Sequence, residues 1–367
     1  MRNKVISILI CSVLAGISLL GLLLPDRWFS VREKRKLQQA PTPSAESLLD
    51  GSYKDKLEAY TLDQFPGRDS WITLKTVTDL SLGKRERNGV YFSKDGYLID
   101  AFRNYDPEQL KANIAHLKTL SDQISGTFQI PVSVLLVPTA AEILEDKLPA
   151  SAPHADESGI LKQTASAGVN LIDPIPLLAA HRDEYLYYRT DHHSTSLGAW
   201  YCYCAWREYH RLPVQSPALW SQEALCDDFY GTTWARTGLP WTKPDTITAW
   251  YRHRNRHVVY NGMEEADSIY ALDHLEKDPY AVFLNSNQAL TVINGSGDSG
   301  KLLLIKDSFG NTFAQFPTED YQQIHMIDPR FFHEDLKNYI RENGITDVLV
   351  YYGVRNFCED TSLVHLN

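Results

Sequence analysis

The sequence has little of what marks several large protein classes. It has no surplus of basic residues, since 36 Lys and Arg stand against 46 Asp and Glu, giving a formal charge of −10. Proteins that wrap nucleic acid normally carry a basic surplus, so we expect no nucleic-acid partner. There is no internal repeat and no low-complexity tract, and a hydrophobic content of 43% is that of a globular chain. The length fits about two domains, or one large domain with an anchor.

Cysteine and cofactor motifs are also scarce. Five cysteines occur, at positions 11, 202, 204, 226 and 358. The Cys-x-Cys spacing differs from that of zinc knuckles and of thioredoxin-like sites, so we expect buried thiols and leave one disulfide open. The glycine-rich stretch Gly295-Ser-Gly-Asp-Ser-Gly300 precedes a predicted strand instead of opening a helix, so it is not a phosphate-binding loop. We therefore expect no cofactor.

One apolar run interrupts this average composition. Residues 5–24 carry no charge and are long enough to cross about 30 Å of hydrocarbon as a helix. Arg2 and Lys4 precede the run, as in a signal peptide or signal anchor, but no Ala-x-Ala cleavage site follows it. We therefore predict an uncleaved anchor. The count of basic residues does not favour an outward C-terminal domain, because several follow the run: Arg27, Arg32, Lys34, Arg35 and Lys36.

Strand-like and helix-like patterns alternate from about residue 107. Continuous apolar runs predict strands covered on both faces, at 132–137, 302–305 and 346–352. Helices are predicted at 108–124, 194–210 and 332–343. Strands separated by helices imply a mainly parallel sheet with helices on both sides. Asp95-Gly96 predicts the turn of a hairpin over 88–98, and 226–292 has the pattern of a β-rich insertion.

The predicted organisation has four segments. Residues 25–62 are charged and contain Pro41 and Pro43, which is typical of a juxtamembrane linker with a short amphipathic helix. The globular pattern starts at the Asp63-Gln-Phe-Pro-Gly-Arg68 segment. We therefore predict a flank at 1–4, a transmembrane signal anchor at 5–24, a linker at 25–62 and one α/β domain at 63–367.

Two segments carry residues suited to chemistry. Ser308 follows the predicted strand 302–305, and ligands of such sheets bind at the carboxyl ends of the strands. A serine hydroxyl needs a base that is itself oriented by a carboxylate, and Asp191-x-His193 offers both. Backbone N–H groups at the next helix start would stabilise an oxyanion. The plainer alternative is that Asp191 or Ser194 caps a helix, and that Ser308 does the same.

A metal site is the rival chemistry at the same segment. Asp191, His192 and His193 are suitable ligand types. Adjacent histidines usually point apart, however, and the chain has no His-Glu-x-x-His or comparable spacing. We therefore expect no metal.

Several short segments occur together in a familiar order. They are Arg32-Glu-Lys-Arg-Lys-Leu37, Asp63-Gln-Phe-Pro-Gly-Arg68, Asn88-Gly-Val-Tyr91 with Lys94-Asp-Gly-Tyr-Leu98, Thr190-Asp-His-His193 and Lys306-Asp-Ser-Phe309. In this combination the chain resembles the bacterial DHHW family, a relative of the alginate O-acetylation proteins. The resemblance implies an SGNH-hydrolase-like three-layer α/β/α domain, outside the cytoplasm and anchored to the membrane.

The resemblance also implies residue roles. Ser308 would be the nucleophile, His193 the base and Asp191 the carboxylate that orients it, with His192 structural or facing the substrate. The family's tryptophan is Ser194 here, and Tyr352 stands where an asparagine is expected. Asn311 or Asn356 would then supply a polar contact. Arg330 would bind an anionic sugar, or pair with Asp328.

The function implied is O-acylation of a cell-surface or secreted polysaccharide. The acyl donor would arrive through a multipass membrane O-acyltransferase. Two alternatives stay open at this point. One is a carbohydrate esterase with the same triad, because the choice between water and a sugar hydroxyl depends on the shape and dryness of the pocket. The other is a non-catalytic protein for polysaccharide binding or assembly.

Overall fold

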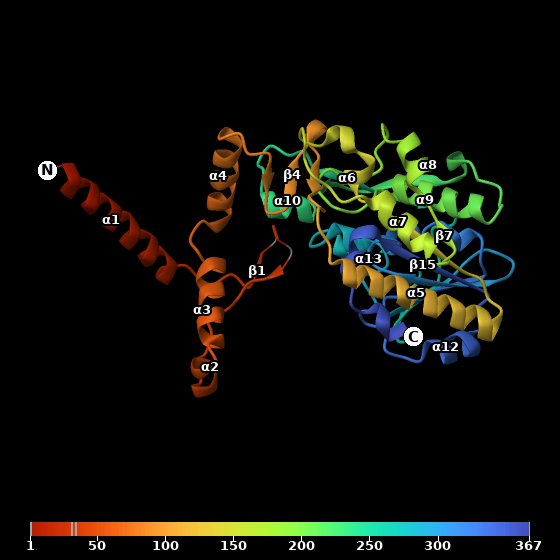
Figure 1. The fold of residues 1–367 in the computed structure, drawn as a ribbon. Coiled ribbons are helices and arrows are strands. Elements are labelled where there is room, and N and C mark those ends of the chain that lie inside the picture. The colour runs from red at the N-terminus through yellow and green to blue at the C-terminus, as the bar shows by residue number, and fades with distance from the viewer. Residues whose placement is uncertain (1, 31, 34, 367) are drawn as a thin grey trace. The chain divides into compact units, whose positions relative to one another are not determined.

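The computed structural model describes residues 2–30, 32, 33 and 35–366, and their contacts form two compact units (Figure 1). Unit 1 comprises Met1–Lys84 with Ala235–Trp241, and unit 2 comprises Arg85–Trp234 with Thr242–Asn367. Positions 1, 31, 34 and 367, among them Lys34 of the basic segment, lie outside the described residues. The first unit boundary falls after Lys84, whereas the sequence predicted that the α/β domain begins at residue 63. The predicted domain limits remain a proposal.

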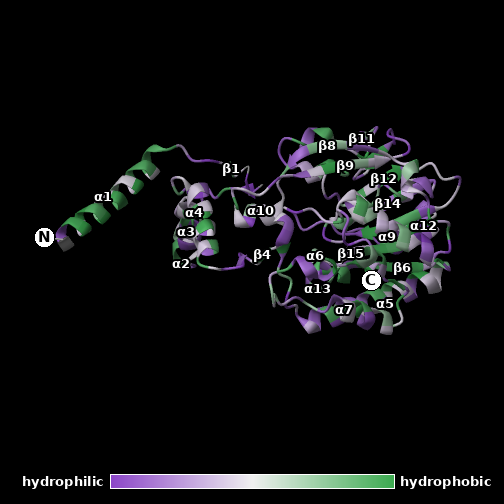
Figure 2. Ribbon diagram, turned by 90° about the horizontal axis from the view of Figure 1, so that it is seen from above, coloured by the Kyte–Doolittle hydropathy of each residue, from purple (hydrophilic) through white to green (hydrophobic). Residues whose placement is uncertain are grey.

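Unit 1 begins with the apolar helix α1, Arg2–Leu23. Its stretch Lys4–Leu23 is long and apolar enough to cross a membrane, with a mean hydropathy of 2.6, and Figure 2 shows it as a hydrophobic helix. A short hairpin of β1 (Phe29–Ser30) and β2 (Arg35–Lys36) follows. Three helices complete the segment: α2 (Ala45–Leu49), α3 (Ser52–Asp63) and α4 (Arg68–Ser81).

Unit 2 is built on a large sheet with the strand order β11-β10-β12-β14-β13-β15-β6-β7. The strands from β14 to β7 pair in parallel, and β12, β10 and β11 add an antiparallel edge. In chain order their bounds are β6 Val132–Val137, β7 Leu171–Ile172, β10 Val258–Tyr260, β11 Glu264–Ala266, β12 Leu290–Asn294, β13 Lys301–Lys306, β14 Gln323–Ile327 and β15 Asp347–Gly353. The predicted β-rich insertion at 226–292 is therefore not separate as a whole, because β10, β11 and β12 extend the main sheet.

Helices cover both faces of this sheet, and its central strands are mainly apolar and buried along almost their whole length. Successive side chains of a strand point to opposite faces. Leu302 and Leu304 accordingly belong to one buried cluster, whereas Leu303 and Ile305 belong to the other. In Figure 1, α5 (Pro107–Phe128) and α12 (Leu336–Asn343) lie on the second face, and α9 (Ser196–Tyr209) on the first. This is the three-layer α/β/α fold that the resemblance implied.

Shorter elements connect these layers. The helices are α6 Ala140–Ile143, α7 Glu157–Ser166, α8 Ile175–Ala180, α10 Thr232–Thr237, α11 Phe309–Phe313 and α13 Val354–Glu359. The remaining strands are β3 Glu86–Arg87, β4 Val90–Phe92, β5 Leu98–Asp100, β8 Ser221–Phe229 and β9 Asp245–Tyr251. The predicted hairpin is confirmed as β4 and β5, and its turn residues Asp95 and Gly96 have φ values of 57° and 78°.

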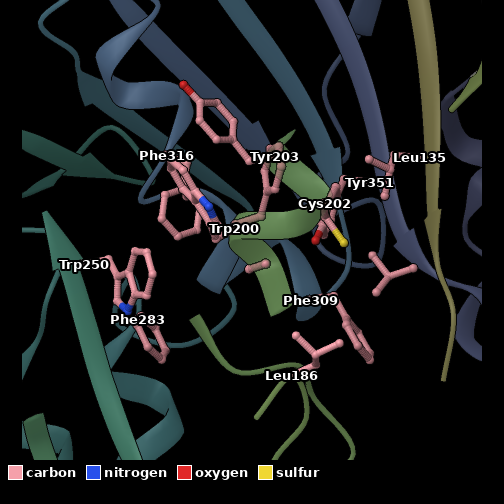
Figure 3. Packing of buried hydrophobic residues seen from close by; sticks show 14 of the residues in the cluster. Leu135, Leu186, Trp200, Cys202, Tyr203, Trp250, Phe283, Phe309, Phe316 and Tyr351 are labelled. Carbon is pink, nitrogen blue, oxygen red and sulfur yellow. The ribbon is translucent and has the colours of Figure 1, made fainter. Parts of the chain in front are cut away.

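Aromatic packing fixes α9 and α11 to the sheet. Figure 3 shows Trp200 and Tyr203 of α9 beside Phe316, at ring-centroid distances of 5.3 and 5.6 Å. Phe309, the residue after Ser308, is 4% exposed and belongs to the same cluster. Burying a side chain of this size stabilises the fold by about 1.5–3 kcal/mol, so Phe309 holds the start of α11 firmly. The structure describes all five cysteines, and each is a free thiol. The one disulfide that the sequence left open is therefore not formed.

Candidate active site

Ser308 lies where the carboxyl ends of the central parallel strands meet. It follows β13 directly, and β13 pairs with β15 in the register Lys306↔Tyr351. The buried carboxylate of Asp307 ties the two strand ends together, because it accepts hydrogen bonds from Phe309 N at 2.9 Å, Gly353 N at 2.9 Å and Asn356 Nδ2 at 2.7 Å. The position of the serine is therefore fixed by the sheet and by its own neighbour.

His193 and Asp191 share the loop that leads into α9. Asp191 Oδ1 accepts hydrogen bonds from His193 N at 3.0 Å and from His193 Nδ1 at 2.6 Å. Asp191 Oδ2 accepts from Thr232 N at 2.7 Å and from Thr232 Oγ1 at 2.9 Å. All four bonds go to one carboxylate that is 4% exposed, so Asp191 is fully partnered and fixed.

The loop reaches the serine across the sheet edge. His193 Nε2 lies 2.8 Å from Ser308 Oγ, although the two residues are 115 positions apart. A carboxylate can only accept, so Nδ1 carries the proton and Nε2 is free to accept from the serine hydroxyl. The contacts Asp191–His193–Ser308 are those that the sequence predicted. The capping alternatives are wrong for Asp191 and Ser194, since Thr195 caps α9 with a bond from Gly198 N at 3.3 Å.

Burial sets the charge states of this array. Burial, together with the charge of His192, lowers the pKa of His193 to about 4 against the opposing effect of Asp191. For Asp191, burial favours the neutral form. The positive charges of His192 and His193 and the hydrogen bonds from His193 and Thr232 outweigh it, and hold the pKa of this carboxyl well below its usual range. Near neutral pH the pair is therefore a carboxylate beside a neutral imidazole that can take a proton.

Tyr280 holds the plane of the imidazole. Its ring stacks on His193 with a centroid distance of 3.9 Å and an interplanar angle of 13°. Its hydroxyl donates to Ser308 O at 3.1 Å and lies 2.9 Å from Thr312 Oγ1. One side chain thus contacts both the base and the backbone of the nucleophile. The sequence carried no local signal for Tyr280, because it lies outside both motifs.

Gly231 and Thr232 are the other site residues that sequence reasoning missed. A Cβ at Gly231 would lie 2.2 Å from Asp191 Cβ, so the approach of this chain segment to the carboxylate requires glycine. Trp234 N donates to Thr190 O at 3.0 Å and fixes the segment against the Asp191 loop. The sequence around Gly231 and Thr232 gave no reason to place them near Asp191.

A narrow cavity opens beside His192 and Phe309. It is bounded by the segments after β6, β13 and β15 and by β5, and its lining is Leu98, Ile99, Asp100, Thr139, Ala140, Tyr188, Asp191, His192, Phe309, Gly353, Arg355 and Asn356. The lining is mainly apolar, with Arg355 3.5 Å from Asp100 Oδ2. A small acyl group of low polarity suits such a wall.

The other predicted site residues differ in their positions. His192 lines the cavity, and its Nδ1 lies 2.8 Å from Thr232 Oγ1. Asn311 does not reach the cavity. It is 2% exposed, and its amide donates to Asn287 Oδ1 at 3.1 Å. Asn356 lines the cavity instead. Arg330 pairs with Asp328, the second of its two predicted roles, through hydrogen bonds of 2.8 and 2.5 Å. Its binding of an anionic sugar remains a proposal.

The predicted oxyanion donors at the start of α11 are already engaged. Phe309 N donates to the Asp307 carboxylate, and Gly310 N donates to Asp307 O at 3.1 Å. Asn311 N donates to Ser308 O at 3.3 Å. The turn uses these three amides to hold itself together, so they are not free to face a substrate, and the oxyanion contribution of this turn remains a proposal.

The metal alternative meets a similar difficulty. Ligand atoms of Asp191, His192 and His193 lie within 4.8 Å of one another, close enough to share an ion. Both nitrogens of His193 are already paired, however, Nδ1 with Asp191 and Nε2 with Ser308. An ion at this cluster would have to displace one of these bonds.

Comparison with known proteins places this site in a family. The profile of the DHHW protein family matches residues 127–327, which include Asp191, His193 and Ser308. The chain is 28% identical over 178 residues to the probable alginate O-acetylase AlgJ of Pseudomonas syringae pv. tomato (strain ATCC BAA-871 / DC3000). That match covers 45% of the chain and 44% of the relative, so the chain spans less than half the length of this relative.

Solved structures share the fold. A DHHW family protein from Eubacterium siraeum DSM 15702 matches with a TM-score of 0.66 and 25% identity, over 76% of this chain and 95% of that one. Bacillus cereus PatB1, solved with a sulfonyl adduct, matches with a TM-score of 0.61 and 16% identity, over 74% of this chain and 98% of that one. Both likenesses agree with the three-layer architecture.

Proposed function

This chain belongs to the DHHW family, and on that premise we propose that it transfers an acetyl group to a polysaccharide hydroxyl through Ser308, His193 and Asp191. The observation that carries the proposal is the chain of contacts from Asp191 through His193 to Ser308, with distances of 2.6 and 2.8 Å. The relationship to a probable alginate O-acetylase supports an O-acetyltransferase-like activity and a polysaccharide acceptor.

The geometry supports a two-step transfer. Ser308 Oγ attacks the carbonyl carbon of the donor ester while His193 Nε2 takes the hydroxyl proton. The donor alcohol leaves with that proton, and the acetyl group stays on Ser308 as an ester. A sugar hydroxyl then attacks this ester, gives its proton to His193, and leaves acetylated, after which the proton returns to Ser308 Oγ. Asp191 keeps the imidazole in the required tautomer and stabilises its charged form.

The proposed setting is the outer face of a membrane. α1 would act as a single-pass anchor, with the C-terminal domain outside the cytoplasm. The acetyl donor would be supplied by a multipass membrane O-acyltransferase, since the sequence carries no phosphate-binding loop for a nucleotide or coenzyme. His192 and Asn356 line the cavity, and this supports the proposal that they contact the donor or acceptor.

The test uses the full chain in detergent with a small aryl acetate. We expect a burst of phenol release and a protein mass increase of one acetyl group. Ser308→Ala should abolish both, with a loss of about 10³-fold or more in turnover. Ser194→Ala is the matched control, because this buried serine lies in the loop of Asp191 and His193 but its hydroxyl makes no hydrogen bond to a described residue.

Two outcomes would contradict the proposal. Unchanged turnover in a folded Ser308→Ala variant would remove the triad assignment. To separate transferase from esterase, the acetyl content of the polymer is measured in cells that carry Ser308→Ala. A fall supports transfer, whereas a rise identifies an esterase.

A further inference from the structure

The segment Asp63–Arg68, which the catalytic proposal does not use, is built against the end of α1. Gln64 fixes the chain just after this helix, because its Oε1 accepts from Arg27 N at 2.9 Å and its Nε2 donates to Arg27 O at 2.9 Å. The same Nε2 donates to Gln38 O at 3.0 Å. Tyr60 Oη donates to Asp26 Oδ1 at 3.0 Å. The turn between α3 and α4 thus holds the residues that leave α1.

The basic segment after α1 joins the same assembly. Arg35 donates to both carboxylate oxygens of Asp63, at 2.8 and 2.6 Å, and Asp63 also accepts from Gln38 N at 2.8 Å. The Arg35 guanidinium lowers the pKa of Asp63 to about 2. Arg68 lies 2.8 Å from Glu33. We call residues 24–38 and 60–71 the collar, excluding positions 31 and 34.

Three aromatic side chains of the collar are exposed. Trp28 is 68% exposed, Phe65 39% and Trp71 49%. The rings of Phe65 and Trp71 contact each other edge to face, with a centroid distance of 6.4 Å. α4 continues the apolar face with Leu74, three residues after Trp71 and 54% exposed. Phe65, Trp71 and Leu74 thus form a group of exposed apolar side chains, and such a group is suited to an apolar neighbour.

The end of α1 lies directly beside this face. A Cβ at Gly21 would lie 3.6 Å from Pro66, so the turn touches the last part of the apolar helix. A groove between them is lined by Leu24, Pro25, Arg27, Gln64, Phe65, Pro66, Gly67, Arg68, Asp69 and Ser70. The five residues from Leu24 to Trp28 can extend by at most about 17 Å. If α1 crosses a bilayer, the collar therefore lies at its surface.

We infer that the collar is seated in the headgroup region of a phospholipid bilayer, with Trp28, Phe65 and Trp71 at the boundary to the acyl chains. Tryptophan and other amphipathic aromatic side chains favour this depth, because one part of the ring is apolar and the other is wet. A bilayer is the occupant that the continuity with α1 favours. The inference rests on the proposed anchoring by α1, and not on the triad.

The experiment places spin labels on the full chain in vesicles of phosphatidylethanolamine and phosphatidylglycerol. Phe65→Cys and Trp71→Cys report on the collar in a background that carries Cys11→Ser and Cys226→Ser. Native Cys11, exposed on α1, is labelled in a separate protein that retains it, and reports on the anchor. Leu219→Cys, at a position 56% exposed in unit 2, reports on water. Collision with oxygen is compared with collision with a water-soluble nickel chelate.

Labels at 65 and 71 should favour oxygen, at a depth within about 5–10 Å of the headgroup boundary. The label at 11 should lie deeper and the label at 219 in water. If 65 and 71 are as accessible to nickel as 219 while 11 remains deep, the collar inference fails and the anchoring stands. If 11 is also accessible to nickel, the anchoring fails, and the collar inference fails with it.

A second arm tests the clamp and the other class of occupant. Gln64→Ala should increase the mobility of the label at 65 while the depth at position 11 stays the same. Gln38→Ala is the matched control, because its side-chain amide donates to the adjacent Gln39 O at 2.8 Å. Labels that are aqueous in lipid vesicles but immobilised in native membranes would assign the face to a membrane-protein partner and overturn the lipid assignment.

Discussion

The stacking of Tyr280 on His193 makes a prediction about the pH dependence of catalysis. Tyr280→Leu removes the ring at 3.9 Å and admits water beside the imidazole. Loss of the stacking is worth about 0.5–1.5 kcal/mol, which corresponds to a loss of roughly 3- to 10-fold in turnover near pH 8. At that pH His193 is neutral in both proteins, so the loss reflects orientation of the base alone.

The larger effect is expected in acid. Burial lowers the pKa of His193 to about 4, and hydration would move it towards the ordinary value of about 6.5. The base must be neutral, and at pH 5 a complete return would reduce the neutral fraction by about 30-fold. Tyr280→Leu should therefore shift the acid limb of kcat/KM for an aryl acetate to higher pH.

Two variants isolate this effect. Tyr280→Phe keeps the ring and loses the bond to Ser308 O, so its acid limb should stay where it is. Tyr260→Leu removes a buried tyrosine, 2% exposed, from β10, and controls for general destabilisation. The reasoning would be refuted if Tyr280→Leu lost the same factor in kcat/KM at pH 5 as at pH 8. Its acid limb would then coincide with that of the unaltered protein.

Three further predictions follow from the same contacts. Gly231→Ala should push Asp191 from His193 and lower kcat by about 10²- to 10⁴-fold with little change in KM, measured by steady-state kinetics; a normal kcat would contradict the close approach. Burial raises the pKa of Glu157 to about 8, above its value in the unfolded chain. The neutral acid therefore contributes stability at low pH, and this contribution is lost as the pH rises from the unfolded pKa to the folded pKa. Glu157→Gln should therefore raise the Tm relative to the unaltered protein at pH 9 but not at pH 4, by calorimetry; equal shifts at both would argue against a buried neutral acid. Chelators should leave aryl acetate turnover unchanged, whereas inhibition reversed by zinc would favour the metal site.

Much of the sheet could be predicted from local patterns. The predicted strand 132–137 coincides with β6, and 302–305 lies within β13, because a strand buried on both faces needs apolar residues at every position. The helix predicted at 194–210 begins two residues later, after the Thr195 cap. Burial and backbone pairing are the causes of these patterns, and both leave a periodic trace within a few residues.

The candidate site shows the same difference between what local sequence predicts and what it does not. Asp191 and His193 are two residues apart, so their bond of 2.6 Å is local and the motif predicts it. Asn311 is also close in sequence to Ser308, but the turn buries it, and sequence distance alone could not decide which asparagine faces the cavity.

The sequence by itself determined the alternation of strands and helices, the apolar helix and the residue types able to transfer an acyl group. Only the tertiary structure decided which of them meet. Ser308 reaches His193 because β13, β15 and β6 pair in a register that aligns their carboxyl ends. Tyr280, Gly231 and Thr232 join them from segments outside both motifs. Such contacts depend on how side chains from distant segments fill one space, and that information is spread over the whole fold rather than written in any single segment.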